Sequence, residues 1–329
     1  MADVGVEGRA EAVVVQPEYS GVCLPSLVVA AGTEVSRRFM EFFLVSIRNP
    51  NTRSAYAGAL KQFFLWCDDR GLLWSSLSPL AISAYIEQHP GAPQTVNQHL
   101  AAIKSLFSWM VQGGVLTVNP AAEVKGVQYR TKVGKTTVLS DEEMRALLGA
   151  IETSDLLDLR DRALIATMFF SFARISAVLG MKVEDYFQKG GKRRFWLRLH
   201  EKGGRYHEVP AHHRVEEFLD AYLEAGELWE AKGSPLFRSA KGRARRLSER
   251  ALSRHDALVM VKRRSAAAGI CTVACNHTFR ASGITNYLKH GGSLDNAQKI
   301  AAHEDSRTTA LYDRRDDSIS LDEIERIRL

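Results

Sequence analysis

The sequence has few cysteines and no long apolar run. Its 329 residues contain 4 Cys and 9 Pro, and Pro25 interrupts the most apolar early stretch, residues 21–31. A membrane helix needs about 20 apolar residues, and a secretory signal begins with basic residues and a continuous apolar segment, where this chain has Asp3, Glu7 and Glu11. These absences predict a cytoplasmic protein without a membrane span, whose cysteines are reduced thiols.

The composition is that of an ordinary globular protein. Hydrophobic residues make up 45% of the chain and charged residues 25%, with no low-complexity tract and no internal repeat. Wholesale disorder and a small disulfide scaffold are therefore excluded. At roughly 150 residues per domain, the length predicts about two domains, each able to bury its own core.

Positive charge is concentrated in the second half. Lys and Arg number 9 against 10 Asp and Glu in residues 1–125, but 35 against 28 in residues 126–329. Three basic runs stand out, at residues 192–194, 243–246 and 262–264. A polyanion is the natural partner of such a domain. Each run by itself is equally well interpreted as a solvated helix face.

The first half has the apolar period of helices. Residues 1–32 lack a clear period and predict a poorly ordered N-terminal arm, whereas residues 33–125 predict a small domain of about four helices. Ser78 before Pro79 is typical of a helix start, and a second helix is expected from Thr95 to the glycines at 113 and 114. The aromatic residues of this domain are expected in its core.

Residues 126–138 are polar and basic, and predict a linker. A phosphate-binding loop at Gly134-Lys135-Thr136 is rejected, because Tyr129 stands where its first glycine is required. Ser140 and Glu143 form a capping box that opens the second domain, residues 139–317. The alternating pattern of residues 195–209, broken by two glycines, predicts a β-hairpin among helices.

Six polar residues of the second half are candidates for one site. In chain order they are Arg174 after a long apolar helix, Lys202 at the hairpin turn, His277 and Arg280 three residues apart, His303, and Tyr312 nine residues beyond it. Taken singly they prove little, since an arginine can form a structural ion pair and turn lysines are usually solvated. The three-residue spacing of His277 and Arg280 places both on one side of a helical turn.

This order resembles the tyrosine recombinases, also called the phage integrase family, from about residue 36 to residue 329. That family has an Arg after an apolar helix, a Lys at a β-hairpin turn, a His-x-x-Arg, a second His, and a Tyr nine residues beyond. Residues 51–56 and 95–100 also look like the family's DNA-binding helices. The resemblance implies a mainly α fold with a small antiparallel β-sheet, arranged as a helical domain and a catalytic domain that clamp DNA.

Phosphoryl transfer explains why these residue types are needed. A phosphodiester under attack gathers negative charge, which planar guanidinium groups match with paired hydrogen bonds. Arg174 and Arg280 are the candidates for this clamp, and His303 is expected to add a donor. Tyr312 would be the nucleophile; a phenol of pKa ~10 needs a base. The resemblance implies His277 as that base and Lys202 as the proton donor to the leaving 5′ oxygen.

The expected product is a 3′-phosphotyrosyl bond, which conserves the phosphodiester energy, so no ATP, metal or other cofactor is implied. The resemblance implies site-specific integration, excision or resolution of DNA elements. The partners it implies are duplex DNA with an inverted-repeat site, a dimer on each site and a tetramer in the synapse, and accessory DNA-bending or directionality proteins. A type IB topoisomerase, a hairpin-forming resolvase and a non-catalytic DNA-binding protein remain alternatives.

The chain departs from the family pattern at three positions. The family usually has an acid three residues after the first Arg, where this chain has Ala177; Asp161 or Glu184 is the expected substitute. Phe172 and Ala302 stand where glycine is common. A zinc site at Cys271 and Cys275 is an alternative for that region, but no second ligand pair follows at a suitable spacing.

Two further features are assigned from the sequence. The contact candidates for DNA are Arg53 and Lys104 in the first domain, and Arg243, Arg245, Arg246 and Lys262 in the second. Residues 318–329 predict a C-terminal helix that has Leu321, Ile324 and Ile327 on one face. This helix either packs on its own domain or, as the resemblance implies, is exchanged onto a neighbouring protomer.

Overall fold

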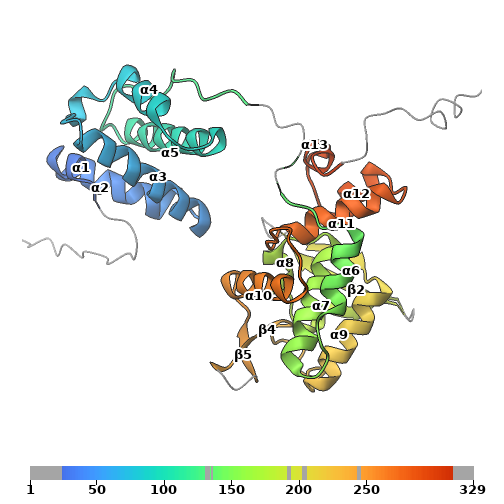
Figure 1. Ribbon diagram of the computed structural model, residues 1–329. Helices are drawn as coiled ribbons and strands as arrows, with labels where there is room; N and C mark the ends of the chain where they lie inside the picture. The colour runs from blue at the N-terminus through green and yellow to red at the C-terminus, as the bar shows by residue number, and fades with distance from the viewer. Residues whose placement is uncertain are drawn as a thin grey trace, which may run out of the picture. The chain divides into compact units, whose positions relative to one another are not determined.

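The computed structural model describes residues 24–129, 134, 136–190, 194–201, 206–242 and 246–313. The chain divides into two compact units, Met1–Arg130 and Thr131–Leu329. Each unit has a hydrophobic core of its own. Figure 1 labels most of their helices and strands, and the two units are described separately below.

Unit 1 is helical throughout its described part. Its elements are α1 (Ser26–Ala30), α2 (Thr33–Glu41), the π-helix η1 (Phe42–Ser46), α3 (Pro50–Asp68), the 3₁₀-helix η2 (Trp74–Ser76), α4 (Pro79–Gln88) and α5 (Pro93–Gln112). Aromatic rings fill the core, where Phe63 packs edge-on against Tyr85 and Phe107. The Ser78 hydroxyl accepts from the Ala81 amide, which confirms the predicted helix start.

The predicted N-terminal arm is wrong over its last residues. Leu27 and Val28 on α1 are buried in the core of unit 1, at 4% and 0% exposure. Five residues are too few to show a helical period, and α1 is held by packing rather than by intrinsic propensity. Residues 1–23 lie outside the described part of the chain.

Unit 2 combines helices with two small antiparallel sheets. Its helices are α6 (Asp141–Gly149), α7 (Leu156–Ser171), α8 (Ile175–Leu179), the 3₁₀-helix η3 (Val183–Asp185), α9 (His213–Ala225), α10 (Arg254–Ala267), α11 (Thr278–Lys289), α12 (Leu294–Ile300) and α13 (Ser306–Ala310). α7 is buried along most of its length and packs on α9 and α11 (Figure 1). The predicted capping box at Ser140 and Glu143 is confirmed at the start of α6.

The strands confirm the predicted hairpin. β1 (Tyr186–Gln188), β2 (Phe195–His200) and β3 (Tyr206–Pro210) form one sheet, and β4 (Arg238–Ala240) pairs with β5 (Leu247–Ala251). In the β2–β3 pair, Leu197 lies opposite Val209, and both side chains are buried in the core. The turn between these strands, with Lys202, lies outside the described residues. Mainly α structure with small antiparallel sheets is the predicted fold class, which is confirmed.

The junction of α7 and α11 depends on a close backbone approach. A Cβ on Gly283 of α11 would lie 2.1 Å from the Phe169 carbonyl oxygen of α7, so only glycine fits there. α7 ends at Phe172, which adopts the left-handed conformation with φ 54°. This turn directs the chain from α7 into Arg174, the N-cap residue of α8.

No helix in the described part of the chain is long and apolar enough to cross a membrane.

Candidate active site

Unit 2 brings five of the six predicted site residues to the ends of neighbouring helices. Arg174 and His277 are the N-cap residues of α8 and α11, Arg280 lies one turn into α11, His303 follows α12, and Tyr312 follows α13. The last two are kept close because α12 packs on α13. Lys202, the sixth residue, lies outside the described part.

The Tyr312 hydroxyl lies within hydrogen-bond distance of His277. Tyr312 Oη and His277 Nε2 are 2.9 Å apart. The Tyr312 ring is 8% exposed and belongs to a small apolar cluster with Phe172 and Ile284, and its backbone carbonyl accepts from the hydroxyl of Thr285 at 2.9 Å. The tyrosine is thus held from both ends, with its hydroxyl against an imidazole.

Arg280 is the most deeply buried charged residue of the site, at 1% exposure. Its Nη1 donates to the carbonyl of Phe172, and its Nη2 donates to the carbonyl of Ala301 at 2.7 Å. Two backbone carbonyls, one from each side, therefore fix the plane of the guanidinium. Its Nε is buried without a hydrogen-bond partner among the described residues.

His303 contacts the face of the tyrosine ring. Its ring stacks on the Tyr312 ring with centroids 5.9 Å apart and planes within 8°. Its Nδ1 is 2.8 Å from the hydroxyl of Thr309, a fully buried side chain of α13. Ala302, just before it, has φ 48°, a conformation that favours the glycine common in the family. Alanine adopts this left-handed conformation here at a modest cost in conformational free energy.

The electrostatics of the site keep both histidines neutral at pH 7. Burial first, and then Arg280 and Arg174, lower the pKa of His303 to about 3. Desolvation and the same two arginines lower the pKa of His277, although the residue is exposed by surface area. Burial and Arg174 lower the pKa of Arg280 to about 10, which leaves it charged at neutral pH. A neutral imidazole is a competent base.

Arg174 is paired with a residue that the sequence analysis missed. Its Nη1 donates to Glu201 Oε2 at 2.5 Å, and the Glu201 side chain is 7% exposed. Glu201 directly follows β2. Sequence spacing gives no sign of this contact, because the two residues lie 27 positions apart and meet only through the packing of α8 on β2.

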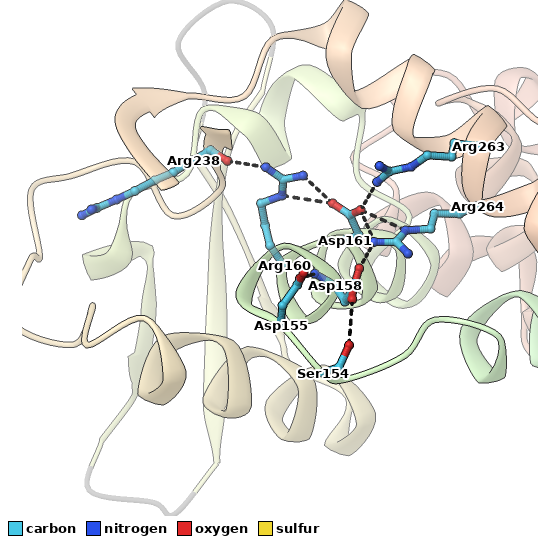
Figure 2. Close-up of polar contacts among 8 residues, drawn as sticks. All are labelled: Ser154, Asp155, Asp158, Arg160, Asp161, Arg238, Arg263 and Arg264. Atoms are coloured by element: carbon cyan, nitrogen blue, oxygen red, sulfur yellow. Dashed lines mark hydrogen bonds and ion pairs between the residues drawn. The ribbon is translucent and has the colours of Figure 1, made fainter. Parts of the chain in front are cut away.

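The prediction that Asp161 or Glu184 takes the place of the missing acid is wrong. Asp161 is fully buried and accepts from Arg160, Arg263 and Arg264, as Figure 2 shows. This network fastens α7 to α10 rather than to the site. Glu184 forms a surface ion pair with Lys182 at 3.3 Å.

The predicted DNA-contact residues have varied surroundings. Arg53 and Lys104 both donate to backbone carbonyls of their own unit, those of Ile47 and Ala122. Arg246 and Lys262 are exposed side chains of unit 2. Arg243 and Arg245 lie outside the described residues.

The zinc alternative gains no support in the described residues, where no group of three His, Cys, Asp or Glu side chains is placed to hold a metal ion. Cys271 is exposed and Cys275 half-buried, and both are free thiols. The Cys275 amide donates to the hydroxyl of Thr278 at 3.0 Å. This contact orders the turn that carries His277 into α11.

Comparison with protein families matches both units. Residues 137–318 match the model of the Phage integrase family, and residues 38–114 match that of the Phage integrase N-terminal SAM-like domain. Among curated proteins, the chain is 28% identical over 269 residues to tyrosine recombinase XerD of Pseudomonas aeruginosa, covering 80% of this chain and 86% of that protein. It is also 28% identical over 274 residues to tyrosine recombinase XerC of Mycobacterium bovis, covering 80% and 88%.

Solved structures share the fold. The XerH site-specific recombinase bound to a palindromic difH substrate superposes with a TM-score of 0.68 at 18% identity, covering 88% of this chain and 93% of that one. A lambda integrase dimer bound to a COC′ core site gives 0.64 at 17% identity, covering 87% and 79%. A lambda integrase tetramer bound to a Holliday junction gives 0.62 at 17%, covering 86% and 78%.

Proposed function

The chain belongs to the phage integrase family of tyrosine recombinases, enzymes that cleave and rejoin DNA, and we propose that Tyr312 is the nucleophile through which it does so. One observation carries the assignment: the 2.9 Å contact between Tyr312 Oη and His277 Nε2, beside the buried Arg280. A tyrosine held against a neutral imidazole and next to a guanidinium has the base and the cationic surroundings that a phenol nucleophile needs.

In the first step, Tyr312 Oη attacks the scissile phosphorus and His277 Nε2 takes up the phenolic proton. The lowered pKa of His277 keeps it unprotonated and ready to accept at neutral pH. The new bond is a 3′-phosphotyrosine, and the bond that breaks leads to the 5′ oxygen. Lys202 is our candidate to donate a proton to that oxygen, from the turn after β2.

Three donors near the tyrosine hold the phosphate in this mechanism. Arg174 and Arg280 are positively charged and match the non-bridging oxygens, where charge accumulates as the tyrosine attacks. His303 contributes a neutral donor. Its Nδ1 faces the hydroxyl of Thr309, and when this hydroxyl donates to Nδ1, the ring proton lies on Nε2.

Rejoining reverses these steps. A 5′ hydroxyl attacks the phosphotyrosine, and Tyr312 leaves with the proton that His277 returns. Because the phosphodiester energy is kept in the intermediate, the cycle balances without ATP. When the hydroxyl comes from another duplex, the result is site-specific recombination, which is the activity that the family assignment supports.

Duplex DNA is the proposed substrate, and other copies of this chain are the proposed partners. The net charge of +6 favours a polyanion, and the XerH and lambda integrase structures that share this fold contain DNA, the latter as a dimer and a tetramer. We propose that the two units clamp an inverted-repeat site, that a dimer occupies each site, and that a tetramer forms the synapse. Exchange of residues 318–329 between protomers and accessory DNA-bending or directionality proteins belong to the same proposal.

The alternatives receive no support from the comparisons. The curated relatives above are recombinases, and a separate N-terminal domain model matches residues 38–114. A type IB topoisomerase would use the same chemistry, but the relatives that match this chain are recombinases. A decayed, non-catalytic protein is disfavoured because the contact of Tyr312 with His277 and the buried Arg280 are both intact.

The proposal is tested by covalent trapping on a nicked suicide duplex that carries the native site. Wild-type protein is expected to form a DNA-linked species on a denaturing gel, and Tyr312→Phe to form none. Tyr287→Phe is the matched control, because Tyr287 packs against Phe172 in the same cluster but lies outside the proposed mechanism. Trapping by Tyr312→Phe, or DNA binding without trapping by wild type, contradicts the proposal.

A further inference from the structure

Glu201 is the carboxylate that lies against Arg174. The contact is direct, with Nη1 of Arg174 2.5 Å from Glu201 Oε2. The two side chains differ in exposure: Glu201 is 7% exposed and Arg174 35%. A guanidinium has five N–H donors, and this contact engages one nitrogen from the buried side. The rest of the Arg174 side chain, 35% exposed, remains accessible to a phosphate.

The carboxylate that pairs with Arg174 comes from the end of strand β2, because helix α8 has no acidic residue in its first turn. The first turn of α8 after Arg174 reads Ile175-Ser176-Ala177, and Ala177 is buried at 1% exposure, so the helix that begins at Arg174 carries no acid there. Glu201 follows β2, whose position is fixed by pairing with both β1 and β3. A carboxylate next to a paired strand is held in a fixed position, so it can orient an arginine at the start of a helix.

We propose that Glu201 is a positioning residue of the recombinase, which holds the Arg174 guanidinium in the orientation that clamps the scissile phosphate. This inference rests on the proposed function. Glu201 acts through Arg174 and does not itself touch the reacting atoms. Glu201 directly precedes Lys202, the proposed proton donor, in the chain. Its contact with Arg174 therefore links the end of β2 to the arginine that is proposed to bind the phosphate.

Charge balance supports the same role. Arg174 and Arg280 repel each other, since Arg174 lowers the pKa of Arg280, whereas Glu201 acts in the opposite direction and raises it. Holding two guanidinium groups at one site costs free energy until a phosphate arrives. Glu201 reduces that cost in the unbound enzyme and keeps the clamp assembled.

The decisive variant is Glu201→Gln, which keeps the shape and removes the charge. We expect the rate of single-turnover cleavage of the suicide duplex to fall about tenfold to a hundredfold, the range for lost orienting contacts, while DNA affinity and melting temperature stay near wild type. Glu208→Gln is the matched control. Glu208 lies in the same sheet and pairs with Arg198 at 3.1 Å and Lys189 at 2.8 Å, neither of which is a proposed site residue.

A double-mutant cycle separates positioning from general structural damage. If Glu201 works through Arg174, then Glu201→Gln adds little loss in an Arg174→Gln background. A purely structural role predicts the same fold loss in both backgrounds and overturns the proposal. So does a faster cleavage rate or tighter DNA binding by Glu201→Gln, because that result means that the carboxylate competes with phosphate for Arg174.

Two further arms keep the test decisive. If Glu201→Gln fails to fold, Glu201→Asp replaces it: this variant keeps the charge but withdraws it by one methylene, so slower cleavage with intact DNA binding supports the proposal and an unchanged rate overturns it. The Tyr312→Phe variant is run in parallel. Trapping that depends on Tyr312 but not on Glu201 defeats this inference alone, whereas trapping that survives Tyr312→Phe defeats the proposed function itself.

Discussion

Replacing Asp161 by Asn should destabilise unit 2 without altering the chemistry of the site. Asp161 is fully buried, and its two oxygens accept from Arg160 at 2.6 Å, Arg264 at 2.7 Å and Arg263 at 3.0 Å (Figure 2). Asparagine has the same size, but it removes the negative charge and turns an N–H₂ group toward a guanidinium. The network joins α7 to α10, so the loss affects the core of the unit.

The magnitude follows from the burial of the arginines left behind. The side chains of Arg160 and Arg264 are 5% and 14% exposed, so both remain poorly hydrated when their shared carboxylate is gone. Breaking a buried pair by removing one partner costs about 3–5 kcal/mol. At roughly 2–4 °C per kcal/mol for a domain of this size, the melting temperature should fall by ~6–20 °C. Asp158 still contacts Arg264 and limits the loss.

Scanning calorimetry of the full chain measures the effect, with Arg263→Ala as the control. The Arg263 side chain is 58% exposed, so its loss should cost no more than about 1 kcal/mol. Below the melting transition, Asp161→Asn should cleave the suicide duplex at the wild-type rate. The reasoning is refuted if Asp161→Asn melts like wild type. Slow cleavage below the melting transition also contradicts it, because that result would mean that Asp161 orients Arg174 after all.

Three further outcomes are expected. Because the pKa of His277 is lowered from its usual 6.5, the single-turnover cleavage rate should decline at acid pH with a midpoint below 6.5; a midpoint above 6.5 contradicts its role as a neutral base. His303 has a pKa of about 3 in the folded chain against ~6.5 in the unfolded chain, so the unfolded chain binds more protons between these pH values and the stability of the folded chain falls as the pH falls. His303→Gln lacks this effect, so its stability relative to wild type should increase as the pH is lowered from 6.5 to 4 in urea titrations. A stability difference that stays constant over this range argues against the lowered pKa. Gly283→Ala should cost about 1–3 kcal/mol by forcing α11 off the Phe169 carbonyl, whereas Gly149→Ala, whose Cβ meets nothing within 4 Å, should be neutral or slightly stabilising by thermal melting.

The sequence predicted the features that depend on neighbouring residues. The capping box at Ser140 and Glu143 and the β-hairpin of residues 195–209 are set by local hydrogen bonding and alternation, and both are confirmed. Helix α1 could not be predicted, because five residues are too few to show the apolar period of a helix. The hydrogen bonds of Arg53 and Lys104 could not be predicted either. A sequence does not distinguish a basic side chain that donates to a backbone carbonyl from one that is free to contact DNA.

Spacing along the chain is enough to propose the site residues, but it does not predict their partners. His277 and Arg280 are three residues apart on one helix, which any sequence displays. From the sequence, Asp161 or Glu184 is the predicted substitute for the missing acid near Arg174, at 13 and 10 positions from it. Packing decides otherwise: three arginines from α7 and α10 converge on Asp161, and the strand that ends at His200 delivers Glu201 to Arg174 instead.

The described residues of the site also explain why neutral histidines serve this chemistry. With His277 and His303 uncharged, Arg174 and Arg280 carry two positive charges and Glu201 one negative charge, and protonated Lys202 adds a third positive charge in the proposed mechanism. This net positive charge favours binding of the negatively charged phosphodiester. In the proposed mechanism, negative charge grows on the phosphate as Tyr312 attacks, and the proton passed to His277 makes the site more positive at that moment. The stabilisation is therefore greater in the transition state than in the bound substrate, which is the condition for a faster reaction.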